Sequence, residues 1–140
     1  MRITLDAYKQ LIQCPKVPPE IGGILGGRNS TIETIIFDEG KKPDLGIKYI
    51  PNVTFLNQHI QEWSTKSINF YGLFHTHSQC WRTLSNNDKR YIETIMRVMP
   101  KNVTHLYFPL VFPEYDIKAF RVEKRHLNVY ISEEKIIIIC

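Results

Sequence analysis

An apolar and aromatic run over residues 68–77 lies between two segments that have the spacing of amphipathic helices. Asn52 stands at the N-cap position of the first segment, and the second segment runs from Ser85 to Pro100, which cannot continue a helix. In both segments apolar residues recur at steps of three and four, the period of one helix face. They are Val53, Leu56, Ile60 and Trp63 in the first, and Tyr91, Ile92, Ile95, Met96 and Met99 in the second. This arrangement predicts a central strand covered by two main helices.

Further strands are predicted on both sides of this unit. Residues 20–27 (EIGGILGG) form a glycine-rich buried strand, and residues 31–38 alternate in polarity and form its hairpin partner across residues 28–30. Asp6 is expected to cap a short helix over residues 6–13, and residues 40–46 are expected to form a loop. The remaining strands are predicted at 104–112, 116–123, 126–131 and 135–140. The fold class is therefore α+β, a single domain over 1–140 in which helices pack on a mixed sheet.

Composition excludes several function classes. The net charge of +4 is small and its basic residues are spread along the chain, so no nucleic-acid partner is expected. No apolar run approaches the roughly 20 residues that a membrane span requires. Three widely spaced cysteines form no CxxC pair or disulfide framework, which favours a reducing, cytoplasmic location. The apolar segment 135–140 fits either a buried strand or the edge of a homodimer.

Two histidines end the central strand and carry the chemistry. His75 and His77 are two residues apart, so their side chains leave a strand on the same face. Asp88 lies in the first turn of the following helix, from where its carboxylate can return to the same point. Two imidazoles and one carboxylate form the open, three-ligand shell of a catalytic zinc site. Taken alone, a His-x-His pair in a strand is more often structural than metal-binding.

The motifs around these residues resemble those of the JAMM (MPN-plus) metalloproteases. That family has a glutamate before a Gly-x-Leu-x-Gly-like strand, then His-x-His, ten residues and Asp, with Ser three residues before the Asp. This chain has Glu20 before GGILGG, then His75-Thr76-His77, and then Ser85 and Asp88. The five positions agree in type, order and spacing, and the order of elements agrees over most of the chain.

The resemblance implies a role for each of these residues. His75, His77 and Asp88 would ligate one zinc ion. Glu20 would act as general base on the attacking water, and Ser85 would donate a hydrogen bond to the developing oxyanion. The chain departs from the family pattern at two loop residues, Ser78 and Leu84, where proline is usual. These departures bear on loop shape and substrate choice.

The resemblance also implies a substrate class. A zinc metallo(iso)peptidase of this type would hydrolyse the amide or isopeptide bond at the C-terminus of a ubiquitin-like or sulfur-carrier-like protein. The extended tail of such a partner is expected to pair with an exposed sheet edge, and the small residues of 20–27 would permit its close approach. The alternative is a catalytically inactive MPN-type scaffold or binding module. A zinc nucleoside deaminase, whose layered architecture is related, would need His-x-Glu and Pro-Cys-x-x-Cys, and neither motif occurs.

Several residues near the motif have a second interpretation. Ser85 and Asp88 also fit a helix capping box, which competes with a ligand role for Asp88. Cys80 is a candidate fourth ligand that would close the site. Trp81 and residues 69–71 are candidates for a substrate groove, although aromatic side chains more often belong to a core.

Overall fold

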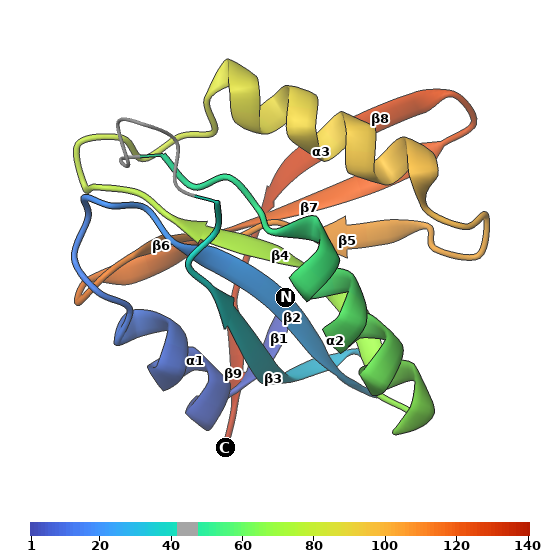
Figure 1. The fold of residues 1–140 in the computed structure, drawn as a ribbon, viewed down its shortest axis with the longest axis horizontal. Helices are drawn as coiled ribbons and strands as arrows, with labels where there is room; N and C mark the ends of the chain where they lie inside the picture. The colour runs from blue at the N-terminus through green and yellow to red at the C-terminus, as the bar shows by residue number, and fades with distance from the viewer. Residues whose placement is uncertain (42–47) are drawn as a thin grey trace.

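The computed structural model describes residues 1–41 and 48–140, and within them nine strands form one mixed sheet with three helices packed against it (Figure 1). The strands are β1 (Arg2–Thr4), β2 (Gly22–Arg28), β3 (Thr31–Asp38), β4 (Asn69–Thr76), β5 (His105–Tyr107), β6 (Leu110–Phe112), β7 (Asp116–Arg125), β8 (Asn128–Glu134) and β9 (Ile137–Ile139). The helices are α1 (Leu5–Ile12), α2 (Val53–Thr65) and α3 (Asn86–Val98). The α+β class with a mixed sheet is confirmed.

The order of strands across the sheet is β5-β7-β6-β4-β2-β3-β1-β9, and β8 pairs with the free side of β7. β2 is antiparallel to both β3 and β4, whereas β1 is parallel to β3 and to β9. β2 therefore has a neighbour on each side and offers no edge to an extended tail. A tail therefore cannot pair with β2 as with an edge strand, because this strand is interior to the sheet.

Alternating side chains of the central strands build a core on each face of the sheet. In β2, Leu25 contacts the cluster on the α1 side, and Ile24 contacts the cluster beneath α2 and α3. In β4, Phe74 and Leu73 divide in the same way. Figure 1 shows α1 apart from α2 and α3, with the sheet between them. Each fully buried aliphatic side chain contributes about 1.5–3 kcal/mol, so both layers hold the sheet in place.

The helix stripes predicted from the sequence match the observed packing except at Val53 in the first turn of α2, which is 57% exposed. Leu56 and Trp63 of α2 and Ile92 and Met96 of α3 are buried. Trp63 lies directly over Gly26 of β2, where a Cβ would come within 2.6 Å of the indole ring. The missing side chain at Gly26 therefore leaves room for the indole of Trp63.

Several details differ from the sequence-based expectations. The strand expected at 126–131 is β8 at Asn128–Glu134, because residues 126–127 form the turn after β7. β1 was not expected, because its three residues are too few for a period-two pattern to show. Thr4, rather than Asp6, caps α1 by accepting a hydrogen bond from the Ala7 amide at 3.3 Å, and Asp6 lies in the first turn, where its charge suits the helix dipole. The strand expected at 104–112 is broken into β5 and β6 at Pro109, which lacks a backbone N–H for the sheet.

Two further expectations concern the surface of the chain. The loop expected over residues 40–46 falls largely on positions 42–47, outside the described residues. Among the helices that the structure describes, none combines the length and the hydropathy needed to cross a membrane.

Candidate metal centre

The end of β4 delivers both histidines to the sheet face that α2 and α3 cover. His75 pairs with Leu110 of β6, and the His77 amide donates to the Val111 carbonyl at 3.0 Å, so the extended backbone continues past the strand. Thr76, between them, faces away and is fully buried, and its hydroxyl accepts a hydrogen bond from the Ile21 amide at 2.9 Å. The i, i+2 spacing thus brings the two imidazoles together, as the sequence predicts.

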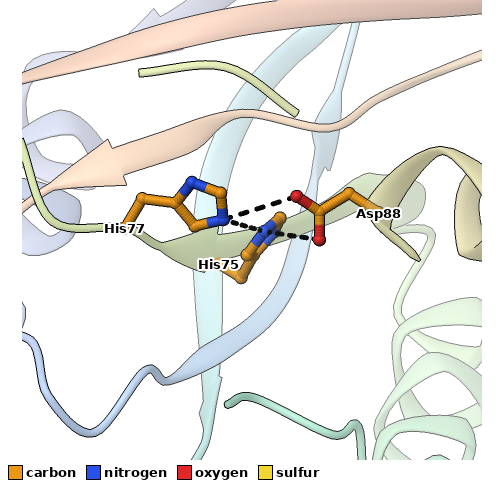
Figure 2. Close-up of side chains that lie close together, drawn as sticks. All are labelled: His75, His77 and Asp88. Atoms are coloured by element: carbon orange, nitrogen blue, oxygen red, sulfur yellow. Dashed lines mark hydrogen bonds and ion pairs between the residues drawn. The ribbon is translucent and has the colours of Figure 1, made fainter. Parts of the chain in front are cut away.

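Asp88 reaches the histidines from the first turn of α3. Its Oδ1 lies 3.2 Å from Nε2 of His75, and its Oδ2 lies 3.4 Å from Nε2 of His77 (Figure 2). The two Nε2 atoms are 2.9 Å apart. These three side chains form one cluster whose potential ligand atoms all lie within 4.8 Å of one another.

The cluster fits a zinc ion in both chemistry and size. Zinc favours imidazole nitrogen and carboxylate oxygen at about 2.0–2.2 Å, so the ligand atoms of a tetrahedral site stand about 3.3 Å apart. The spacings of 2.9, 3.2 and 3.4 Å agree with that value. Acceptor atoms gathered this closely repel one another unless a proton or a cation lies between them. A metal cation satisfies all three at once.

The tautomer of His77 suits a metal ligand. Its Nδ1 donates to the backbone carbonyl of Trp81 at 3.0 Å, and a carbonyl oxygen can only accept. In the neutral ring the lone pair is therefore on Nε2, which points at His75 and Asp88. Support of this kind from the second nitrogen is usual for metal-binding histidines.

The pKa values of Asp88 and His77 are both shifted from their usual ranges. Burial would raise the pKa of Asp88, but hydrogen bonds from His75 and His77 outweigh it and lower the pKa well below its usual range. Burial lowers the pKa of His77, but hydrogen bonds with Asp88 and the Trp81 carbonyl, together with the charges of Asp88 and Glu20, raise it overall. The Asp88 carboxylate is therefore ionised at neutral pH, and a metal at His77 would compete with the proton that the raised pKa favours.

Glu20 lies beside this cluster, just before β2. Gly22 is paired with His75, and the Thr76 amide donates to the Ile21 carbonyl at 2.8 Å. Continuing this antiparallel register by one residue puts Glu20 opposite His77, on the same face of the sheet. The half-buried carboxylate accepts a hydrogen bond from the Tyr49 amide at 3.3 Å. No sequence pattern predicted this contact with Tyr49, because it depends on how the chain returns after β3.

Ser85 caps α3 and faces solvent. Its Oγ accepts a hydrogen bond from the Asp88 amide at 3.0 Å, while its own amide donates to Asp88 Oδ2 at 2.8 Å. The capping box and the metal cluster therefore coexist in Asp88, and the expectation that one role would displace the other is wrong. A carboxylate has about four lone-pair sites, which is enough for both.

The remaining candidate residues, Cys80, 69–71 and Trp81, lie at different distances from the cluster. Cys80 is exposed and is not part of the ligand cluster that the described residues form. Phe70 and Tyr71 pack into the two cores at the start of β4, at the opposite end from His75, so the suggestion that residues 69–71 line the site is wrong. Trp81 adjoins the site through its carbonyl, and 72% of the residue is exposed.

A hollow in the surface lies away from the cluster. It has a volume of about 490 Å³ and is lined by residues of α1, β7, β8 and β9 and by Arg82. Four of its charged residues pair with one another, Arg82 with Asp116 at 2.7 Å and Lys118 with Glu133 at 3.7 Å. The candidate metal ligands lie elsewhere and are mostly covered, with 8–18% of each side chain exposed.

Two solved structures share this fold. AF2198, a JAB1/MPN domain protein of Archaeoglobus fulgidus, matches 99% of this chain over 99% of its own length, with a TM-score of 0.56 and 16% sequence identity. The chain has an MPN-like fold. Protein DSY2949 of Desulfitobacterium hafniense matches 98% of this chain over 91% of its own length, with a TM-score of 0.69 and 18% identity. No protein-family model matches the sequence, and no curated protein is significantly similar to it. At these identities the MPN-like fold is what the comparisons show.

Proposed function

We propose that this protein is a zinc-dependent JAMM-type metallo(iso)peptidase. The observation that carries the proposal is the convergence of His75, His77 and Asp88 on one point, on an MPN-like fold. These three residues would hold one zinc ion per chain and leave a fourth position open. Zinc held there would lower the pKa of water from about 15.7 to about 7 and would polarise the scissile carbonyl.

The side chains around the cluster would carry the proton transfers. Glu20 would accept a proton from the attacking water and deliver it to the leaving amine. Its place opposite His77 supports this role. Ser85 would stabilise the oxyanion: its Oγ accepts from the Asp88 amide, so its hydroxyl proton is free to be donated.

The proposed substrate is the C-terminal tail of a ubiquitin-like or sulfur-carrier-like protein, joined through an amide or isopeptide bond. The partial exposure of the candidate ligands, 8–18% of each side chain, supports a substrate of this kind, because a thin extended tail can approach side chains that a bulky group could not reach. The exposed indole of Trp81 would provide an apolar contact next to the scissile bond. β2 is interior, so the tail would pair with the loop over residues 78–85 rather than with the glycine strand.

The test is cleavage of a ubiquitin-like protein fused through its Gly-Gly tail to a reporter peptide. The zinc-loaded wild type is expected to release the reporter, with the cut located by mass spectrometry. Glu20→Gln is expected to retain one zinc per chain and to be slower by about 10²-fold or more, the usual contribution of a general base. A zinc-loaded wild type that cuts neither peptide nor isopeptide fusions would favour the inactive scaffold.

A further inference from the structure

Tyr49 donates hydrogen bonds to two carboxylates, one from its hydroxyl and one from its backbone amide. Both carboxylates lie on the sheet face that carries His75 and His77, called the site face below. Its hydroxyl donates to Oδ2 of Asp38 at 2.8 Å, and its backbone amide donates to Oε2 of Glu20 at 3.3 Å. Within the described residues, the Glu20 carboxylate accepts its hydrogen bond from this amide. Tyr49 therefore links a carboxylate at the end of β3 to the one that precedes β2.

Asp38 is a rigid anchor for that link. It is 5% exposed, and its carboxylate accepts three hydrogen bonds, from the Gly40 amide at 2.8 Å, from the Asn52 amide at 2.9 Å and from the Tyr49 hydroxyl. A buried carboxylate is stable only when such donors satisfy it, so the donors and the acceptor hold one another in place. Burial and the neighbouring Asp38 raise the pKa of Tyr49, so its hydroxyl keeps the proton that it donates.

The ring of Tyr49 lies in the middle of the site face. Gly22 of β2 is paired with Asp38 on one side and with His75 on the other, so these three residues share a face of the sheet. The Tyr49 ring occupies the space above Gly22, where a Cβ would overlap it. The absence of a side chain at residue 22 is thus what admits Tyr49 between the anchor and the metal cluster.

We propose that Tyr49 is a positioning residue for Glu20. The proposal rests on the proposed function, in which Glu20 is the general base. Glu20 stands outside the strand, where a glutamate side chain has several rotamers open to it. With its hydroxyl on Asp38 and its ring on Gly22, Tyr49 presents its amide in a fixed place and selects the rotamer that faces His77. Displacing a catalytic group by about 1 Å can cost about 10²-fold in rate.

The competing explanation is that Asp38 and Tyr49 only hold residues 48–52 against the sheet. Removing the hydroxyl would then lower thermal stability and leave turnover per folded, zinc-loaded molecule unchanged. Positioning predicts a different result: turnover falls, while zinc content and KM stay the same. Among the described residues, Tyr49 is hydrogen-bonded to Asp38 and Glu20 and to none of the proposed metal ligands, so it would act on the reaction through Glu20.

The first experiment compares Tyr49→Phe with Tyr130→Phe as zinc-loaded proteins. Tyr130 is a half-exposed tyrosine of β8 that packs on Arg125, at the far end of the sheet. We expect kcat for tail cleavage to fall about 10-fold or more in Tyr49→Phe, with zinc content and KM within about twofold of wild type. Tyr130→Phe is expected to match the wild type. A Tyr49→Phe protein that is folded and has the wild-type kcat would overturn the proposal.

The second experiment needs neither zinc nor activity. In the metal-free protein, amide hydrogen exchange at residue 49 is followed by NMR, with the Ile24 amide in the centre of β2 as the reference for an intact fold. Glu20→Ala and Asp38→Asn are each expected to speed exchange at residue 49 about 10-fold or more while Ile24 is unchanged. Unchanged exchange at residue 49 in both variants would overturn the link. If the wild type cuts no tail, the proposed function fails, and this measurement still decides whether Tyr49 holds Glu20.

Discussion

Ser85 and Asp88 exchange two hydrogen bonds across the first turn of α3, at 3.0 and 2.8 Å, while the Asp88 carboxylate stays within 3.4 Å of both histidines. The helix start is thus part of the metal cluster rather than a neighbour of it. The same two bonds that begin α3 fix the rotamer of Asp88, so folding of the helix presents the ligand already oriented.

Replacing Ser85 with alanine removes a helix cap and a proposed oxyanion donor together. We expect Ser85→Ala to lose about 1 kcal/mol of unfolding free energy, the usual cost of an N-cap, and to lower turnover by about 10²-fold or more. Urea unfolding and tail-cleavage kinetics measure the two effects. Ser85→Thr keeps a hydroxyl at the cap and is the matched control. A stability loss with unchanged turnover would leave Ser85 with a capping role alone.

Loss of either of two ligands should abolish zinc binding. His77→Ala and Asp88→Ala are each expected to drop from about one zinc per chain to near zero after dialysis, because two remaining ligands hold zinc weakly. Elemental analysis of the purified proteins measures this. His126→Asn removes a histidine from the exposed turn between β7 and β8 and should keep its zinc. Full zinc content in either ligand variant would show that the assignment of the metal site is wrong.

Cys14 should be the slow thiol of this chain. It is 4% exposed, and burial raises its pKa to about 11, whereas Cys80 is exposed. Iodoacetamide at pH 8 is expected to alkylate Cys80 quickly and Cys14 only after unfolding, because the thiolate is the reactive form. Peptide mass spectrometry measures both sites in one sample. Equal rates at the two thiols in the folded protein would contradict the burial of Cys14.

Because the pKa of Cys14 is raised, the free energy of unfolding is expected to fall as the pH rises above about 8.5. An unfolded thiol loses its proton near pH 8.5, whereas the folded one keeps it until about pH 11. The contribution of Cys14 is therefore complete below about pH 8.5 and is lost as pH rises towards 11. Cys14→Ala should unfold with a shallower pH dependence in this window, measured by urea titration at several pH values. An identical pH dependence in the wild type and Cys14→Ala would show that Cys14 does not make this contribution.

Gly26→Ala should strain the contact between β2 and α2. The new Cβ would lie 2.6 Å from the indole of Trp63, which is 6% exposed and cannot move into solvent without loss. We expect a loss of about 1–3 kcal/mol, the usual cost of overpacking. Trp63→Leu provides the second arm of a double-mutant cycle: in that background Gly26→Ala should cost much less. Additive effects would mean that the two residues do not press on one another.

The local pattern of the sequence was sufficient to predict most of the fold, and together with the motif spacing it predicted that His75, His77 and Asp88 converge. Hydrophobic periodicity predicted α2, α3, the β2–β3 hairpin and β4 to within about two residues. Asn52 and Ser85 were recognised as caps because a capping side chain acts within one turn of its own helix. His75 and His77 were expected to converge because a strand sends alternate side chains to one face.

Tertiary structure alone decided the features that join distant segments. β1 is three residues long and exists because β3 and β9 flank it, which no local pattern reveals. That β2 is interior, and closed to an extended tail, follows from strand order, which is a property of the whole sheet. Tyr49 reaches both Asp38 and Glu20 only because the chain folds back over Gly22. Periodicity and capping act over a few residues and can be read along the chain, whereas pairing across the sheet depends on which segments bury one another's apolar surface.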